Sequence, residues 1–356
     1  MNTGKQKIYI RADGNSQIGV GHQMRCLSVA DVFCQQGRTV IFLTADESGA
    51  VLPKSRGYEC MVLDSDYREP EQEILKVQTI LRQREEGKPL LLLDSYFIRK
   101  SYLEALRDDA FLIYFDDYGK EAWPADCIIN YNIYGPDMPY DRLYPQPPLL
   151  LLGSAYAPLR QEFADTEHIA KKQVTDVLIT TGGADAYNVA GQLAERLAGG
   201  QAVPEEDHIR YHVISGVFHT FRDELHRLAA KYPNIIIHEN VTQMAQLMAE
   251  CDIAVSAAGS TLYELCAVKV PVVSFYFVDN QFLPARYFAE RTRMLVCGNY
   301  AAQPEETLQS LYEGVRLLEQ EEAVRNTVAE SLENVTDGRG AERIAACLSE
   351  RFLRDN

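Results

Sequence analysis

The chain has a shortage of basic residues. Its 356 residues include 35 Lys and Arg against 51 Asp and Glu, so the formal net charge is −16 and the pI is near 4.9. Proteins that bind nucleic acids or anionic membranes need clustered Lys and Arg side chains. We therefore expect neither a nucleic-acid partner nor a membrane partner.

Paired cysteines, a secretory leader and long apolar runs are also lacking. The eight cysteines are scattered, with no CxxC pair and no repeated spacing, as is usual for free thiols. No apolar run is long enough to span a bilayer, and no signal peptide is recognisable. These features predict a reduced, soluble, cytoplasmic protein.

Two motifs that would indicate a cofactor or metal are not where they would be needed. In "GVGHQM", Met24 stands where the third glycine of the dinucleotide-binding G-x-G-x-x-G motif would be. Asp116 and Asp117 are adjacent rather than spaced as Asp-x-Asp, and we interpret them as structural or as a sugar contact. We predict no metal and no cofactor.

What the sequence does contain is a regular alternation of short apolar runs and helical patterns, which is typical of parallel α/β sheets. In the first half we predict helices at 21–36, 70–86 and 99–109, and strands at 7–12, 39–45, 59–64, 89–95, 111–117 and 127–132. Residues 134–163 are irregular and rich in proline. The second half is helical from about residue 304, with strands predicted at 175–181, 209–216, 234–240, 252–258, 270–277 and 293–298.

Two successive parallel sheets predict an α/β protein with two Rossmann-like domains facing a cleft. We place the domains at 1–160 and 161–335, followed by a last helix within 336–356 that packs back on the first domain. A homodimer is compatible with the helical tail. Ligands of such sheets bind outside the carboxyl ends of the strands, so the loops after the strands are the candidate sites.

The loop after the first predicted strand, in "RADGNSQIGVGHQMRCLSVA", carries glycines and a histidine. Gly19 and Gly21 precede a helix, so a ligand can approach its free N–H groups closely, although a tight turn is the competing interpretation. His22 and Arg25 share a face of that helix. The helix dipole disfavours a protonated imidazole, so His22 can serve as a base, or it can merely satisfy loose backbone groups. Asp13 is the nearest candidate to hold its tautomer.

Three loops of the second half combine glycine with polar side chains. In "TTGGADAYN", Gly182 and Gly183 follow a strand, and Asp185 can cap the next helix. A plain capped turn is the competing interpretation. In "SAAGSTLYEL" and "VDNQ" the candidate ligands for phosphate, ribose and sugar groups are Gly259, Ser260, Thr261, Glu264, Asn280 and Gln281.

These stretches together, with "LLLDSYFI", "IYFDDYG" and "LGSAYAPLRQEF", resemble a known family in content and in order. The pattern from Gly259 to Gln281 resembles the nucleotide-binding half of MurG-related GT-B glycosyltransferases. The whole set, over roughly residues 7 to 300, is similar to the UDP-sugar hydrolases of pseudaminic acid biosynthesis, a wider family that includes the spore-coat protein SpsG. The family's common second glycine before Gly259 is Ala258 here, which fits if its φ is negative.

The resemblance implies a GT-B-like fold and cleavage of UDP-2,4-diacetamido-2,4,6-trideoxy-β-L-altrose to free sugar and UDP, by water and with inversion. It implies sugar-side chemistry in domain 1–160, with His22 as general base and Tyr96 and Asn280 lining the reacting sugar. Gly21 and Arg25 belong to the same wall. It implies UDP binding in domain 161–335 through Gly182, Ser260, Thr261 and Glu264, with Gln281 on the donor sugar.

Two alternatives remain open at the level of the sequence. The first is an inverting GT-B glycosyltransferase with the same nucleotide pocket, for which UDP release would depend on an acceptor. The second is a non-catalytic nucleotide-sugar-binding protein of coat polysaccharide assembly, which would bind UDP without turnover.

Overall fold

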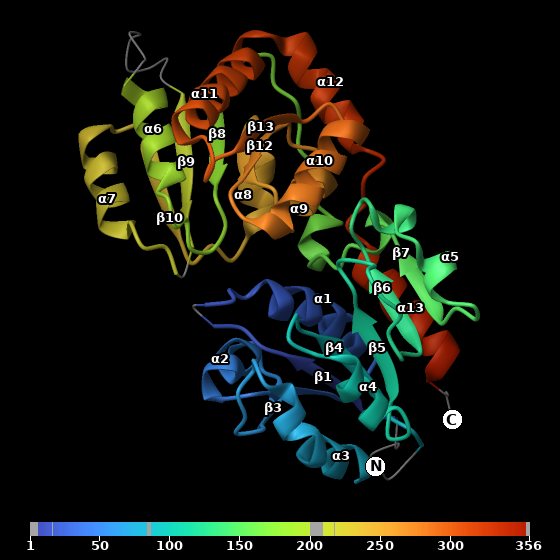
Figure 1. Ribbon diagram of the computed structural model, residues 1–356. Helices are drawn as coiled ribbons and strands as arrows, with labels where there is room; N and C mark the ends of the chain where they lie inside the picture. Colours follow the sequence, from blue (N-terminus) through green and yellow to red (C-terminus); the bar gives the residue numbers. More distant parts are fainter. Residues whose placement is uncertain (1–5, 16, 84–86, 200–208, 217, 354–356) are drawn as a thin grey trace. The chain divides into compact units, whose positions relative to one another are not determined.

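The chain divides into two compact units. The computed structural model describes residues 6–15, 17–83, 87–199, 209–216 and 218–353. Unit 1 comprises Met1–Arg160 and Arg339–Asn356, and unit 2 comprises Gln161–Gly338. Each unit has one parallel sheet with helices beside it (Figure 1).

Unit 1 is built on a seven-stranded parallel sheet of order β3-β2-β1-β4-β5-β6-β7. Its strands are β1 (Ile8–Ala12), β2 (Val40–Thr44), β3 (Glu59–Val62), β4 (Leu90–Asp94), β5 (Phe111–Phe115), β6 (Cys127–Asn130) and β7 (Leu149–Leu152). Every residue of β1, β2 and β4 is buried, as expected for strands covered on both faces. The six strands predicted for this half are confirmed.

Strand β7 was not predicted, because its four leucines follow a proline-rich stretch that reads as irregular. It pairs in parallel with β6 at the edge of the sheet, from Cys127↔Leu149 to Asn130↔Leu152. An edge strand has a partner on one side only, so prolines just before it cost no ladder hydrogen bond.

The helices of unit 1 are α1 (Gly21–Gln35), α2 (Glu47–Ser55), α3 (Ile74–Arg82), α4 (Lys100–Leu106), α5 (Tyr140–Leu143) and α13 (Gly340–Phe352). The predicted helix at 70–86 begins with a 3₁₀ turn at Pro70–Glu73 before α3, and residues 84–86 lie outside the described part. Helix α13 packs against α1 and buries Ile344, Ala345 and Leu348. The last helix of the chain is therefore part of unit 1.

Unit 2 has a six-stranded parallel sheet of order β10-β9-β8-β11-β12-β13. Its strands are β8 (Asp176–Thr180), β9 (Arg210–Ser215), β10 (Ile235–Glu239), β11 (Ile253–Ala257), β12 (Val272–Tyr276) and β13 (Leu295–Asn299). Its helices are α6 (Val189–Gly199), α7 (Arg222–Lys231), α8 (Met244–Glu250), α9 (Thr261–Val268), α10 (Phe282–Arg291), α11 (Pro304–Gln320) and α12 (Glu322–Leu332). All six strands predicted for this half are confirmed.

In both sheets the strand order reverses beside the first strand of the unit. In unit 1 the chain moves outward from β1 to β2 and β3, then returns to place β4 on the other side of β1. In unit 2 the reversal lies between β8 and β11. Such switch points open a crevice at the carboxyl ends of the strands, which is where ligands of doubly wound sheets bind.

No helix in the described part of the chain is long and apolar enough to cross a bilayer.

Candidate functional site

The loop between β1 and α1 is a tight turn that presents the start of α1. Asn15 and Gly19 exchange two backbone hydrogen bonds, of 3.2 and 2.8 Å, and the Asn15 side chain accepts from the amide of Ile18. Gly19 has φ of +72°, a conformation that glycine adopts without steric cost. Gly21, the first residue of α1, is exposed and has open space where a Cβ would stand. The turn leaves the first residues of α1 accessible.

His22 pairs with Asp94 at the carboxyl end of β4. Its Nδ1 lies 2.6 Å from Asp94 Oδ1, and its side chain is 11% exposed. Burial alone would raise the pKa of Asp94, but the neighbouring Arg25 and His22 lower it overall, so the carboxylate is ionised. An ionised carboxylate can only accept, so Nδ1 of His22 carries the proton and donates it. The other ring nitrogen, Nε2, is then the one that can take a proton.

Arg25 joins Asp94 to a second carboxylate, Asp117. Its Nε and one terminal nitrogen donate to Asp94 at 2.6 and 2.5 Å, and the other terminal nitrogen donates to both oxygens of Asp117 at 3.0 and 3.1 Å. The guanidinium also lies 4.7 Å from the centroid of the Phe115 ring. This bidentate arrangement fixes the position of Asp94 and, through it, of His22.

Tyr96 stands against His22 and is held by the same network. The two rings meet edge to face with centroids 4.6 Å apart, and the Tyr96 hydroxyl donates to Asp117 at 2.8 Å. Burial of that hydroxyl and the Asp117 charge raise the pKa of Tyr96 well above its usual value. The residue as a whole is 47% exposed, so Tyr96 offers an aromatic surface next to the imidazole.

Asp13 does not hold the imidazole, and that prediction is wrong. Its carboxylate is bound by the buried Arg11 and accepts from the backbone amide of Ala45 at 2.8 Å. Arg11 in turn pairs with Glu73 at 2.6 Å. These contacts tie the end of β1 to its neighbours, so Asp13 supports the turn and Asp94 takes the place next to His22.

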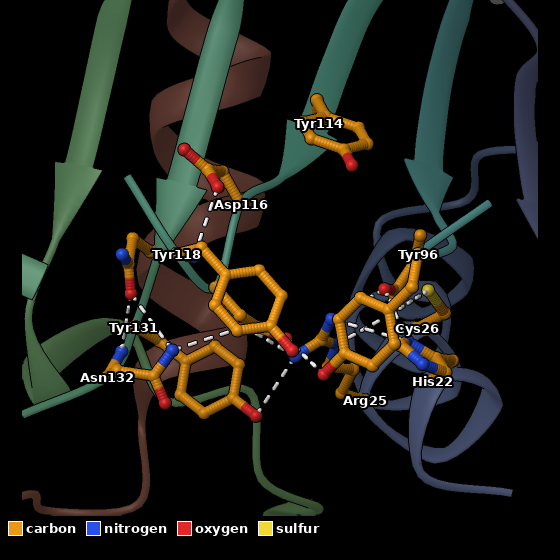
Figure 2. Close-up of polar contacts among 12 residues, drawn as sticks. His22, Arg25, Cys26, Tyr96, Tyr114, Asp116, Tyr118, Tyr131 and Asn132 are labelled. Carbon is orange, nitrogen blue, oxygen red and sulfur yellow. Dashed lines mark hydrogen bonds and ion pairs between the residues drawn. The ribbon is translucent and has the colours of Figure 1, made fainter. Parts of the chain in front are cut away.

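Sequence reasoning did not single out Asp94, Tyr131 or Asn132, and it left Asp117 without a partner. Tyr131 accepts from Arg25 at 3.1 Å (Figure 2). Asn132 donates to Asp117 at 3.1 Å. Burial raises the pKa of Tyr131 to about 12. The available signal was position: these residues end or follow buried strands on the side of the sheet where the first helix begins.

In unit 2 the loop after β8 carries Gly182 and Gly183. Gly182 has φ of +90°. Both glycines are exposed, and no atom lies within 4 Å of the position that a Cβ would occupy. The two oxygens of Asp185 accept from the amides of Val189 and Ala190, each at 2.9 Å, so Asp185 caps α6 as predicted. Its side chain is 1% exposed, which makes it a supporting residue and not a ligand contact.

The loop after β11 leads into a helix start without a side-chain cap. No side chain caps the start of α9, Ser260 is exposed, and Gly259 has open space around its Cα. Thr261 begins α9 and Glu264 lies in its first turn. Ala258 is not among the described residues with positive φ, so alanine fits there. This helix start offers N–H groups and hydroxyls that suit phosphate.

Asn280 and Gln281 lie in a 3₁₀ turn after β12, at Asp279–Gln281. The Asn280 side chain is exposed. The carbonyl oxygen of the Gln281 side chain accepts from the amide of Phe277 at 3.2 Å, which fixes the loop and leaves the amide nitrogen as its donor. The structure thus gathers the predicted residues of unit 2 on three loops at the carboxyl ends of β8, β11 and β12.

The described residues include no group of three or more His, Cys, Asp or Glu side chains arranged to hold a metal ion. Asp64 and Asp66, which are spaced as Asp-x-Asp after β3, have other contacts: Asp64 pairs with Lys76 at 3.7 Å, and Asp66 accepts from the amide of Arg68.

Comparison with known proteins gives relatives over nearly the whole chain. The chain is 26% identical over 358 residues to the spore coat polysaccharide biosynthesis protein SpsG of Bacillus subtilis, covering 98% of this chain and 99% of SpsG. It is also 26% identical to the UDP-2,4-diacetamido-2,4,6-trideoxy-beta-L-altropyranose hydrolase of Campylobacter jejuni, covering 80% of this chain and 97% of the hydrolase. No family model matches the chain.

Solved structures agree on the fold. MurG of Acinetobacter baumannii superposes with a TM-score of 0.66 at 15% identity, covering 97% of this chain and 99% of MurG. A glycosyltransferase of Rickettsia africae superposes with a TM-score of 0.58 at 11% identity, covering 97% and 98%. The protein therefore has the two-domain α/β fold of the GT-B class. Within that class its similarity in sequence is to SpsG and to the altropyranose hydrolase, the proteins that the sequence motifs resemble.

Proposed function

We propose that the protein hydrolyses a UDP-linked diacetamido-trideoxy sugar, UDP-2,4-diacetamido-2,4,6-trideoxy-β-L-altrose, to the free sugar and UDP in nonulosonate (pseudaminic acid) biosynthesis. The observation that carries the proposal is the His22–Asp94 pair, locked by Arg25 at the exposed start of α1. The named activity of the Campylobacter jejuni relative supports the substrate.

His22 acts as the general base. Asp94 accepts from Nδ1, so Nε2 takes a proton from a water molecule as that water attacks the anomeric carbon. The bond between the anomeric carbon and the diphosphate oxygen breaks, and its electron pair leaves with UDP. The imidazolium that forms is stabilised by Asp94 until its proton passes to solvent. Attack on the face opposite UDP inverts the anomeric centre.

The leaving UDP is stabilised by unit 2. The uncapped start of α9, with the hydroxyls of Ser260 and Thr261, offers N–H and O–H donors for the charge that develops on the diphosphate, so no metal is needed. Gly182 and Gly183 allow close backbone approach to the ligand. In this scheme Glu264 accepts from ribose hydroxyls, and Asn280 and Gln281 contact the sugar.

An inverting glycosyltransferase is the second candidate, and the GT-B structural neighbours favour it. In that case His22 would take the proton of an acceptor hydroxyl and not of water. The two candidates differ in one observable: a hydrolase releases UDP from the donor alone, whereas a transferase releases it when an acceptor is added.

The test is incubation of the protein with the diacetamido donor and a chelator, following UDP and free sugar by NMR. We expect both products in equal amounts, and a fall of about 10²- to 10⁴-fold in kcat for His22→Ala. His226→Ala is the matched control, because His226 also pairs with a carboxylate, Glu239 at 3.3 Å, but is exposed on α7. Intact donor after incubation with wild-type protein overturns the hydrolase; chelator sensitivity overturns the metal-free mechanism.

A further inference from the structure

Unit 1 contains a cavity that none of the roles above explains. It has a volume of about 320 Å³ and opens at the carboxyl ends of β4 and β5. We call it the Trp123 pocket, because the single tryptophan of the chain lines it. Its other lining residues are Tyr96, Ile98, Arg99, Lys100, Tyr114, Phe115, Asp116, Asp117, Tyr118, Lys120 and Glu121.

A pair of aromatic rings in the lining of the Trp123 pocket, Tyr96 and Tyr118, leads to the proposed base. Tyr96 contacts His22 on one side and lies 5.6 Å, centroid to centroid, from Tyr118 on the other. Figure 2 shows the Tyr118 and Tyr96 rings near one another, with His22 beyond Tyr96. Two further lining residues, Tyr114 and Trp123, have ring centroids 4.5 Å apart. A group in this pocket therefore sits one aromatic ring away from His22.

The carboxylates that line the pocket are already used as acceptors. Asp117 accepts from Arg25, Tyr96 and Asn132. Asp116 accepts from the amides of Tyr118 and Gly119 at 3.1 Å and from the hydroxyl of Tyr140 at 2.9 Å. Glu121 pairs with Lys100 at 3.0 Å. Asp116 and Asp117 thus have little acceptor capacity left for the hydroxyl groups of an unmodified sugar, and the charge of Glu121 is compensated by Lys100.

The charged groups of the lining that remain available to a ligand are hydrogen-bond donors. The Lys120 ammonium lies 4.8 Å from the centroid of the Tyr118 ring, and neither Lys120 nor Arg99 pairs with a carboxylate in the described part of the chain. A ligand that fits aromatic walls and N–H donors must combine an apolar group with an acceptor oxygen. An N-acyl group has both: its methyl packs on aromatic rings, and its carbonyl oxygen accepts a charge-assisted hydrogen bond.

We propose that the Trp123 pocket binds an N-acyl substituent of the reacting sugar and so selects acylated donors. The inference rests on the proposed function, because it takes the sugar at His22 as given. It assigns Lys120 and Arg99 to the acyl carbonyl, and Tyr118 and Trp123 to the acyl methyl. It thereby names the chemical group by which this site distinguishes its donor from other UDP-sugars.

Trp123 provides a direct readout, since it is the only tryptophan. The emission of the full-length His22→Ala protein, which is expected to consume the donor only slowly, is measured during titration with four ligands. Calorimetry of the same titrations reports total binding. The ligands are UDP, UDP-glucose, UDP-glucuronate and the diacetamido UDP-sugar. We expect a saturable change in Trp123 emission with the diacetamido donor, and none with UDP. An equal change with UDP-glucose, a larger change with UDP-glucuronate, or none with the diacetamido donor overturns the proposal.

A second variant tests the donor group. Lys120→Met keeps the aliphatic stem and removes the ammonium, and we expect it to weaken binding of the diacetamido donor about tenfold, as for one hydrogen bond to a charged group. Binding of UDP should not change. Lys88→Met is the matched control, because Lys88 also lies over a ring, 4.9 Å from the Phe111 centroid, outside the pocket. Unchanged donor affinity in Lys120→Met overturns the assignment.

These measurements separate the pocket from the hydrolase. Binding and emission do not require turnover. If the protein binds acylated donors in the expected order without hydrolysing them, the proposal for the Trp123 pocket stands and the hydrolase proposal fails. If the protein hydrolyses the diacetamido donor with no change in Trp123 emission, and KM is unchanged in Lys120→Met, the hydrolase proposal stands and the proposal for the Trp123 pocket fails.

Discussion

At the scale of single residues, the central feature of unit 1 is one guanidinium between two carboxylates. Arg25 carries one positive charge, and Asp94 and Asp117 carry two negative charges within hydrogen-bond distance of it. Burial by itself lowers the pKa of Arg25, but Asp117 and Asp94 raise it well above the usual value. The three side chains together therefore carry one net negative charge, and His22 contacts one of the two carboxylates, Asp94. A base that becomes cationic during the reaction is stabilised by this surplus.

Asp94→Asn tests the role of the negative charge beside His22. We expect kcat to fall by up to about 10⁴-fold, because an amide can donate to Nδ1 and hold the imidazole in the wrong tautomer. We also expect the free energy of unfolding to fall by about 3 kcal/mol, because a buried charge loses part of its pairing. Urea unfolding and UDP release measure the two effects.

Asp109→Asn is the control for Asp94→Asn. Asp109 is buried too, but its partner Arg82 is 59% exposed. The free energy of unfolding should therefore fall by less than about 1 kcal/mol, and activity should be unchanged. Wild-type activity in Asp94→Asn would contradict the role given to the His22–Asp94 pair.

The identity of the base could be proposed from the sequence, whereas its partner could not. Asp13 is close to His22 along the chain, and proximity in sequence suggested the pair. In the sheet, β4 lies beside β1 in register, with Ala12 opposite Asp94, and this brings a residue 72 positions away to the imidazole. Local periodicity identifies strands but does not give their order, so the contact required the three-dimensional structure.

At the scale of elements, both units place glycines where a strand passes into a helix. Gly182 has positive φ, whereas Gly259 is not among the residues with positive φ. At both glycines no atom lies within 4 Å of the position that a Cβ would occupy. An added methyl group at Gly259 is therefore compatible with the fold but occupies space that a phosphate would need. At Gly182 an added methyl also strains the backbone.

Gly259→Ala should therefore leave the melting temperature unchanged and weaken UDP binding, as measured by calorimetry. Gly182→Ala should lower both stability and UDP affinity. Gly57→Ala is the control for strain, since Gly57 has φ of +84° in a turn after α2 with open space around it. It should lower stability alone. Full UDP affinity in both Gly259→Ala and Gly182→Ala would contradict the phosphate-binding role of these loops.

A chain of polar contacts crosses β10, β9 and β8, from His238 through His212 to Asp176. The ring nitrogens of the two histidines lie 2.9 Å apart, and His212 Nε2 lies 2.8 Å from Asp176 Oδ1. Burial, and then the neighbouring His212, lower the pKa of His238 below its usual 6.5, while Glu250 acts weakly in the opposite direction. The folded state therefore binds a proton at His238 less readily than the unfolded chain does.

The contribution of neutral His238 to the stability of unit 2 should consequently be fully present above pH 6.5 and decrease as the pH falls below that value. His238→Gln should make thermal melting less dependent on pH across this range, because glutamine can still donate to His212 but does not titrate. His226→Gln, at an exposed position on α7, should keep the wild-type dependence. A steeper dependence in His238→Gln would contradict this interpretation.

Twelve of the strands were predictable because each is a compact apolar run bounded by polar residues. Strand β7 was not, since its leucines directly follow "PQPP" and a short edge strand gives little periodicity. Helix α2 was missed for a related reason: it has nine residues, includes Pro53 and buries only Gly49, Ala50 and Pro53. Short elements at the edge of a sheet depend on tertiary contacts that no sequence window contains.

At the scale of the whole molecule, unit 2 is a continuous segment and unit 1 is not. Unit 2 runs from Gln161 to Gly338 with its own core, whereas unit 1 is completed by α13 from the end of the chain. The side chains of Ile344 and Leu348 in α13 are fully buried, and burial of two such side chains contributes about 3–6 kcal/mol. That is comparable with the entire stability of an ordinary domain, about 5–15 kcal/mol.

Residues 161–338 expressed alone should therefore fold cooperatively and bind UDP, while residues 1–160 alone should not give a cooperative unfolding transition. Circular dichroism during thermal melting and UDP calorimetry measure these outcomes. Adding residues 339–356 to 1–160 through a flexible linker should restore the transition. A cooperative transition in 1–160 alone would contradict the contribution assigned to α13.

The return of α13 to unit 1 also has a consequence for the newborn chain. The ribosome finishes the strands of unit 1 early, but the helix that covers α1 is made only after all of unit 2. At ordinary rates of translation of about 5–20 residues per second, the uncovered face of α1 waits roughly ten to forty seconds. During that interval unit 2 can fold while unit 1 exposes apolar surface, so the nascent protein should need chaperone protection for its first half.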